Sequence, residues 1–103
     1  MDLRHARVFV TVADLGTVSG AARQLRVAQP ALSRQIRDLE RDLGFDLFDR
    51  VGRRLLLTNA GEQLLGEVRG LVNHATAVDE RARLIGRGDA GVLKVAEIGR
   101  AHV

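Results

Sequence analysis

Apolar residues in the first 45 positions recur at helical spacing in three blocks, separated by short polar or glycine-containing breaks. Apolar residues three and four positions apart share one face of a helix, so the blocks predict three amphipathic helices. The expected buried positions are Leu3, Ala6, Phe9, Val10 and Ala13 in residues 2–14, Val18, Ala21, Ala22 and Leu25 in the second block, and Leu32, Ile36, Leu39 and Leu43 in the third.

Capping and helix-breaking residues define the ends of these helices. Thr17 precedes the second block and can cap its free amides. Pro30 suits the first turn of the third helix because it has no amide hydrogen, and Gln29 before it is expected to be extended. Gly44 ends that helix. Since only residues 26–29 separate two short helices, a helix-turn-helix is predicted.

The spacing changes after the third helix. Two short apolar segments, Leu47–Arg50 and Leu55–Leu57, flank a turn near residues 51–52. This pattern is typical of a β-hairpin, and it places Arg53 and Arg54 near the tip.

A long helix is expected from residue 59 to about residue 86, capped by Thr58. Its apolar residues alternate spacings of four and three, which is typical of a helix that pairs with another helix. Glycines at 61, 66 and 70 weaken the helix by up to about 1 kcal/mol each, so packing must hold it. The residues expected to face the partner helix are Leu64, Val68, Leu71, Ala75, Val78, Ala82 and Ile85.

The last fifteen residues carry a different pattern. Residues 89–96 contain "GVLKVA", which predicts one strand without visible partners. The segment "EIGRAHV", residues 97–103, back-translates to a widely used sequencing adapter. We therefore expect a non-native tail and a natural protein that continues beyond Ala96.

Composition restricts the class of protein. A chain of 103 residues that is 46% hydrophobic is expected to form about one small domain. It has no cysteine, which excludes disulfides and thiolate metal sites and fits a reducing compartment. No apolar run has the length of a signal core or membrane span, so a cytoplasmic protein is expected.

The positive charge lies in the first half of the chain. Residues 1–58 hold ten arginines and seven carboxylates, a net +3 that equals the net charge of the whole chain. The window Leu15–Arg37 contains four arginines and no carboxylate. Such clustering is expected of a phosphate-binding surface. Arginine abundance alone also fits a GC-rich coding sequence.

The outer side of the third helix carries candidate chemistry for reading DNA. A Gln amide can pair with adenine, Arg with guanine or phosphate, and small apolar edges with the thymine methyl group. The candidate residues are Gln29, Pro30, Ala31, Ser33, Arg34 and Arg37. A solvated polar face is the alternative interpretation, and Arg34 could also pair with Asp38 at i+4. At about 1.5 Å per residue the helix is roughly 20 Å long, enough to cross a major groove.

Three further residues could contact the DNA backbone. Arg53 and Arg54 at the hairpin tip could reach phosphates beside the third helix, although a charged turn is often only solvated. Thr17 could add a contact through its hydroxyl and the adjacent amides.

Enzyme chemistry has little support in the sequence. The three histidines, at positions 5, 74 and 102, are far apart and have no metal-ligand spacing. Asp38 and Asp42 share a helical face but alternate with arginines, which favours surface ion pairs over paired catalytic acids. No cofactor is expected. A protein-interaction module built on the long helix remains possible, but it does not explain the arginine clustering.

Residues 1–61 resemble the N-terminal domain of LysR-type transcriptional regulators. The resemblance rests on "DLR", "SGAARQL", "AQPALSRQIRDLE", "LFDR", "GRR" and "LTNAG" at their spacings. One departure is Ala28, where many members have serine, so a capping oxygen is missing at the third helix.

This resemblance implies a mainly α fold. Residues 1–58 would form a winged helix-turn-helix of three helices plus a β-hairpin wing, and residues 59–88 a dimerisation linker helix. Residues 89–96 would begin an effector-binding domain that is otherwise missing. Such regulators are bacterial activators or repressors that bind double-stranded DNA at inverted repeats. They often form tetramers and respond to a small molecule through that domain.

Overall fold

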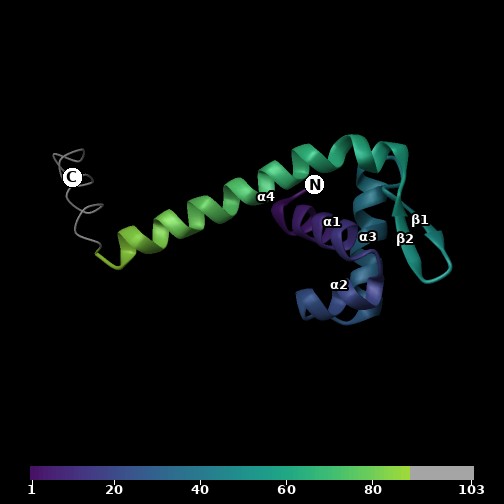
Figure 1. The fold of residues 1–103 in the computed structure, drawn as a ribbon, viewed down its shortest axis with the longest axis horizontal. Helices are drawn as coiled ribbons and strands as arrows, with labels where there is room; N and C mark the ends of the chain where they lie inside the picture. The colour runs from purple at the N-terminus through teal and green to yellow at the C-terminus, as the bar shows by residue number, and fades with distance from the viewer. Residues whose placement is uncertain (89–103) are drawn as a thin grey trace. The chain divides into compact units, whose positions relative to one another are not determined.

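The computed structural model describes residues 1–88 and confirms the predicted mainly α fold (Figure 1). The chain divides into two compact units, an N-terminal unit of residues Met1–Val72 and a second unit from Asn73 onward. The predicted strand at 89–96 and the tail at 97–103 lie outside the described residues. The elements are α1 Leu3–Leu15, α2 Val18–Leu25, α3 Gln29–Leu43, β1 Phe48–Val51, β2 Arg54–Leu57 and α4 Asn59–Gly86.

Side-chain caps begin three of the four helices. The Thr17 hydroxyl accepts a hydrogen bond from the Gly20 amide at 3.1 Å, and the Thr58 hydroxyl accepts one from the Gly61 amide at 3.0 Å, as predicted. Asp2 caps α1 by accepting from the His5 amide at 2.8 Å. These bonds satisfy amides that the first turn of a helix leaves free.

The start of α3 differs from the sequence prediction by one residue. Gln29 was expected to be extended, but it is already helical, and Ala28 before it is extended with ψ 144°. The helix can begin before Pro30 because the Leu32 amide donates to the Ala28 carbonyl at 3.0 Å, which closes the first turn around the proline. Ala28 makes no side-chain cap bond, as its methyl group requires.

Left-handed backbone ends the first three helices. Gly16 ends α1 with φ 75° and Gly44 ends α3 with φ 86°, conformations that cost glycine little. The residue that ends α2 is Arg26, with φ 58°, and it is the non-glycine residue with positive φ among residues 1–88. A Cβ in this region costs about 1 kcal/mol.

The core of the N-terminal unit lies between α1, α2, α3 and the hairpin. The predicted stripes of α2 and α3 are confirmed, since Ala21, Ala22, Leu32, Ile36 and Leu39 are buried and Val18, Leu25 and Leu43 pack partly against them. The prediction for α1 was partly wrong. Val8 and Val12 are buried beside Ala6 and Phe9, whereas Leu3 is 39% exposed. The buried face is wider than one stripe because α1 contacts α2, α3 and β2.

The predicted hairpin forms, with β1 displaced by one residue from the expected bounds and β2 beginning one residue earlier than expected. Antiparallel pairing runs from Phe48 with Leu57 to Val51 with Arg54. The ring of Phe48 packs edge to face on Phe9, with centroids 5.6 Å apart. The Leu55 amide donates to the Gly16 carbonyl at 2.9 Å. These contacts attach both strands to the helical core.

The first half of α4 belongs to the N-terminal unit. Val68 is buried in the core of its own chain, and Leu64 packs partly against it. The expectation that both face a partner helix is therefore wrong for Val68, because α4 lies along the core at that point. Farther along α4, Leu71, Val78 and Ile85 are 50%, 50% and 44% exposed. No helix within residues 1–88 has both the length and the apolar character needed to cross a membrane.

Candidate nucleic-acid interface

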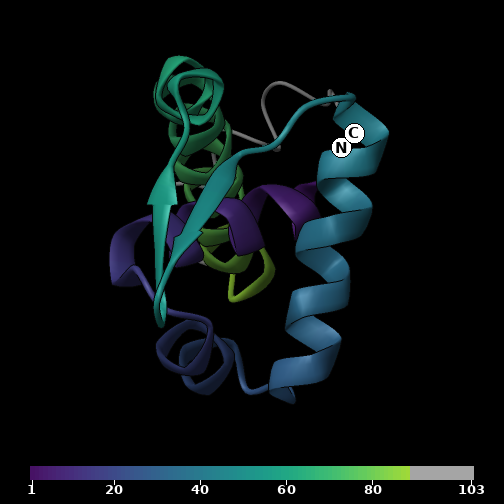
Figure 2. The same ribbon diagram turned by 90° about the vertical axis from the view of Figure 1, so that its right-hand side faces the viewer.

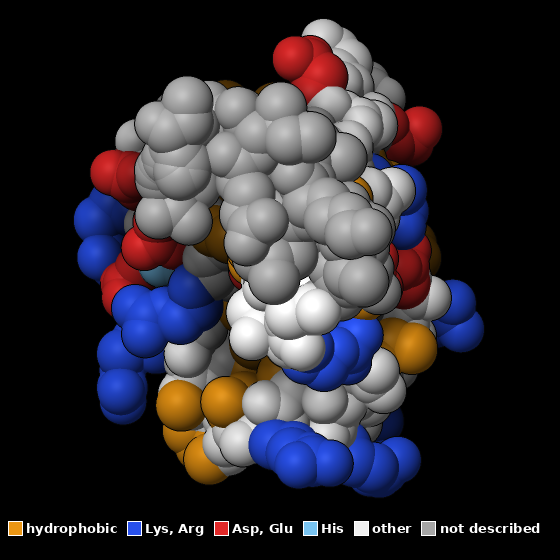
Figure 3. All heavy atoms as spheres, turned by 90° about the vertical axis from the view of Figure 1, so that its left-hand side faces the viewer, with side chains coloured by type: hydrophobic (Ala, Val, Ile, Leu, Met, Phe, Trp, Pro, Cys, Tyr) orange, Lys and Arg blue, Asp and Glu red, His pale blue; other side chains and the backbone are white. Residues whose placement is uncertain are grey.

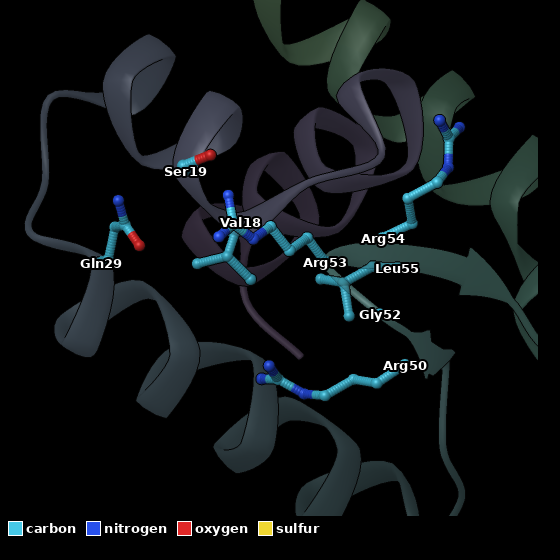
Figure 4. A pocket seen from close by; sticks show the side chains of 8 residues that line it. All are labelled: Val18, Ser19, Gln29, Arg50, Gly52, Arg53, Arg54 and Leu55. Carbon is cyan, nitrogen blue, oxygen red and sulfur yellow. The ribbon is translucent and has the colours of Figure 1, made fainter.

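The hairpin turn and the start of α3 lie at the same end of the N-terminal unit, near α2 (Figure 2). A hollow of about 410 Å³ lies between them, here called the arginine hollow. Three elements therefore contribute to one concave surface. The hollow is lined by Val18, Ser19, Gln29, Arg50, Gly52, Arg53, Arg54 and Leu55 (Figure 4).

The arginine hollow is positively charged. It contains three arginines and no carboxylate, and none of these arginines forms an ion pair with another residue in the described part of the chain. In Figure 4 the Arg53 side chain extends from the turn toward Val18, and the Arg50 side chain extends toward α3. Unpaired guanidinium groups around a concave surface favour binding of phosphate or another anion.

A second hollow, of about 430 Å³, lies between the hairpin and the middle of α3. Ser33 and Arg37 line it from α3, and Arg50 lines it from β1 as well as lining the arginine hollow. Gln29, Ser33 and Arg37 follow one another at four-residue spacing, so they lie on one side of α3. This side of the helix, together with Arg50, connects the two hollows.

Arg50 was missed by sequence reasoning. The alternation of side chains along a strand could have identified it, because residues two apart share a face of the strand. Phe48 is buried against the core, so Arg50 in β1 lies on the same side, toward α3.

The remaining candidates on α3 line neither hollow. Pro30 and Arg34 are exposed, and Ala31 is partly buried. The alternative pairing of Arg34 with Asp38 does not form, and Asp38 instead accepts a hydrogen bond from Arg41 at 3.1 Å. An aspartate that precedes an arginine by one turn is the favoured order in a helix. Arg34 is left without an ion pair in residues 1–88.

Thr17 lies at the junction of α1 and α2, and the side chain of Arg54 reaches this junction from β2. The Thr17 hydroxyl is engaged with the Gly20 amide, and Thr17 lines neither hollow. The Arg54 guanidinium lies close to Gly16 at this junction. A Cβ added to Gly16 would be 3.6 Å from Arg54 Nη2. It points away from Gln29 in Figure 4. Arg53 and Arg54 therefore diverge, since successive side chains near a strand point to opposite faces.

Two aspartates with lowered pKa values, Asp2 and Asp14, lie outside both hollows. A bidentate hydrogen bond from Arg69, at 2.8 and 3.2 Å, lowers the pKa of Asp14. The His5 amide lowers the pKa of Asp2.

On the face opposite that of Figure 2, acidic and arginine side chains are both present (Figure 3). In residues 1–88 no three His, Cys, Asp or Glu side chains are grouped so that they could hold a metal ion.

Curated relatives of this chain are transcriptional regulators. It is 43% identical over 100 residues to the HTH-type transcriptional regulator ClcR of Pseudomonas putida, an alignment that covers 96% of this chain and 34% of ClcR. It is 41% identical over 100 residues to XapR of Escherichia coli strain K12, with 97% and 34% covered. The chain therefore spans about a third of the length of these relatives.

Solved structures with the same fold include complexes with DNA. The CbnR DNA-binding domain in its DNA complex has a TM-score of 0.73 at 36% identity, and 84% of this chain and 99% of that chain are covered. The BenM DNA-binding domain bound to benA site 1 DNA has a TM-score of 0.76 at 35% identity, with 85% and 99% covered.

A family model matches most of the N-terminal unit. The model for bacterial regulatory helix-turn-helix proteins of the lysR family matches residues 3–62, which include α1, α2, α3, the hairpin and the start of α4. All the residues that line the two hollows lie within this range. The chain thus belongs to the LysR family of bacterial helix-turn-helix regulators.

Proposed function

We propose that this chain binds double-stranded DNA in a sequence-specific manner, as the DNA-binding part of a LysR-type transcriptional regulator. The observation that carries the proposal is the position of Gln29, at the start of α3 and in the same hollow as three unpaired arginines. A base-reading group and phosphate-binding groups thus share one surface. DNA recognition needs both kinds of contact, because phosphate contacts position a protein and base contacts give specificity.

The side chains divide into two roles on DNA. With the start of α3 in the major groove, the Gln29 amide can pair with adenine, and Pro30 and Ala31 can contact a thymine methyl group. Ser33, Arg34 and Arg37 supply further hydrogen-bond donors along the helix. The arginines of the hairpin, Arg50, Arg53 and Arg54, and the Thr17 region contact phosphates beside the groove. This assignment adds Arg50 to the residues expected from the sequence.

Two copies of the chain would associate through α4. Leu71, Val78 and Ile85 are about half exposed in one chain, and Ala75 and Ala82 lie at the same heptad spacing. A second α4 would cover these side chains. Two-fold pairing places two recognition helices on half-sites about 34–36 Å apart, or a multiple of this distance, which fits an inverted-repeat operator.

The longer regulator would have further properties. We assign residues 1–58 to the DNA-binding domain and residues 59–88 to the linker helix, although the compact unit extends to Val72. A protein as long as the relatives would add an effector-binding domain that senses a small molecule, and it would form tetramers. The protein would act in the bacterial cytoplasm and would not be an enzyme.

The test is binding of Gln29→Ala to a cognate duplex selected from random sequences. Loss of a bidentate base contact should cost about 1–3 kcal/mol on that duplex and much less on random DNA. Gln63→Ala is the matched control, because Gln63 is an exposed glutamine on α4 that lines neither hollow. Equal losses on both duplexes would remove Gln29 from base reading.

Salt dependence distinguishes DNA binding from a protein-interaction module. A protein that neutralises phosphates loses duplex affinity steeply as salt rises, because counterions are released on binding. A helix-pairing module without a DNA surface would show no duplex affinity at any salt concentration, and that result would refute the proposed function.

A further inference from the structure

The hairpin, here called the wing and defined as Phe48–Leu57, is fixed by one backbone hydrogen bond from β2 and by another at its base. The Leu55 amide donates to the Gly16 carbonyl at 2.9 Å, which joins the wing to the junction of α1 and α2. The Thr58 amide donates to the Leu47 carbonyl at 2.9 Å, which joins it to the start of α4. Neither bond reaches α3, the helix that carries Gln29.

Glu40 supplies the link to α3. Its Oε2 atom accepts hydrogen bonds from the Leu47 amide at 2.7 Å and from the Phe48 amide at 3.2 Å. Phe48 is the first residue of the wing and Leu47 directly precedes it, and both residues are buried. An ionised oxygen accepts such bonds more strongly than a neutral one. A single carboxylate therefore connects the recognition helix to the start of β1.

The carboxylate also stays apart from the arginines around it. Glu40 lines the second hollow together with Arg37 and Arg50, but it forms an ion pair with neither. The other two acids of α3 have different partners, since Asp38 pairs with Arg41 and Asp42 with the N-terminal amine at 3.0 Å. Because Glu40 is engaged with the backbone, both neighbouring guanidinium groups stay available for a phosphate.

We propose that Glu40 is a positioning residue for DNA binding, which holds the wing at the distance from α3 where Arg50 and Arg53 share a hollow with Gln29. This inference rests on the proposed function, because it concerns how base and phosphate contacts are made together. Without the link, the wing keeps its apolar contacts with α3 but loses the hydrogen bonds that fix its distance from the helix that enters the groove.

Through charge alone, removal of a carboxylate from a DNA-binding surface should strengthen DNA binding, whereas loss of positioning should weaken it. Glu40→Ala and Asp38→Ala each remove one negative charge from α3, so simple electrostatics predicts tighter binding for both variants. Positioning predicts weaker binding for Glu40→Ala alone. The comparison of these two variants therefore separates the roles by the sign of the effect.

The experiment measures duplex affinity of the chain at several salt concentrations for these variants and for Arg53→Ala. Glu40→Ala should bind about tenfold more weakly and lose about one unit of salt slope, as expected when a phosphate contact is lost. Arg53→Ala should cost little in the Glu40→Ala background, because the wing contact is already lost. Glu40→Gln should bind at least as tightly as the unaltered chain, since its amide oxygen can still accept both hydrogen bonds.

Folding is checked by circular dichroism. If Glu40→Ala does not fold, Glu40→Leu replaces it, because leucine keeps the aliphatic contacts of this half-buried position. Amide exchange at Leu47 and Phe48, measured by NMR without DNA, should be faster in the Ala or Leu variant than in Asp38→Ala. The inference is overturned if the Ala or Leu variant binds as tightly as Asp38→Ala, or if Arg53→Ala costs the same in both backgrounds. An unaltered chain without duplex affinity would instead refute the proposed function.

Discussion

Gly61 is the position where one added methyl group should disturb the fold most clearly. It is buried in the first turn of α4, where the helix passes over the start of the wing. A Cβ added there would overlap the Leu47 carbonyl oxygen and would lie 3.0 Å from Leu57 Cδ2. The carbonyl oxygen belongs to the backbone and already accepts a hydrogen bond from the Thr58 amide. It therefore cannot move aside as a flexible side chain would.

The expected free-energy change for Gly61→Ala is the balance of two effects. Alanine favours a helix over glycine by about 1 kcal/mol. Overpacking a tight contact costs about 1–3 kcal/mol, and weakening the Thr58–Leu47 hydrogen bond costs about 1 kcal/mol more. The variant should thus be less stable by about 2 kcal/mol. For a domain of this size the melting temperature should fall by roughly 8–16 °C.

Gly66→Ala is the matched control, because Gly66 lies in the same helix and a Cβ there would meet no atom within 4 Å. Only the helix preference applies, so this variant should melt about 4–8 °C higher than the unaltered chain. Thermal unfolding by circular dichroism at one fixed protein concentration measures both changes. The reasoning would be refuted if both variants shifted the melting temperature in the same direction.

Three further substitutions test other features. Arg26→Asn should raise stability by about 1 kcal/mol, because asparagine tolerates positive φ, whereas Arg26→Ala should bring no such gain; equal melting temperatures for the two variants would contradict this. Asp14→Asn should lower the free energy of unfolding at pH 7 by less than about 1 kcal/mol, since the Asp14–Arg69 pair is half exposed and screened. Because the pKa of Asp14 is lowered in the folded chain, this stabilisation is present above its unfolded pKa of about 3.9 and is lost as pH falls through the folded value. Urea unfolding at pH 7 and pH 2 measures it, and a difference that persists at pH 2 would count against the pair. Val78→Asp should shift the chain toward monomer in sedimentation equilibrium, and an unchanged mass would exclude Val78 from the dimer interface.

The local structure of this protein could be predicted from its sequence. Helix starts at Thr17 and Thr58, the helix end at Gly44 and the hairpin before α4 all follow from interactions within a few residues along the chain. The side of α3 that carries Gln29 and Ser33 also follows, because helical periodicity separates it from the buried stripe. These features depend on backbone geometry and capping, which short sequence segments encode.

The tertiary structure decided which residues meet. Val68 shares the heptad spacing of Val78, yet it is buried in its own core. In this half of α4, Gly61 lies against Leu47 and Arg69 pairs with Asp14 of α1. From the sequence, Gly61 is only a residue that weakens a helix. In the structure, the Leu47 carbonyl oxygen approaches so closely that no side chain fits at this position. Arg50 and Glu40 acquire their places only when β1 is brought beside α3. Spacing reports what shares a face within one element, whereas the partner of that face depends on how distant segments pack together.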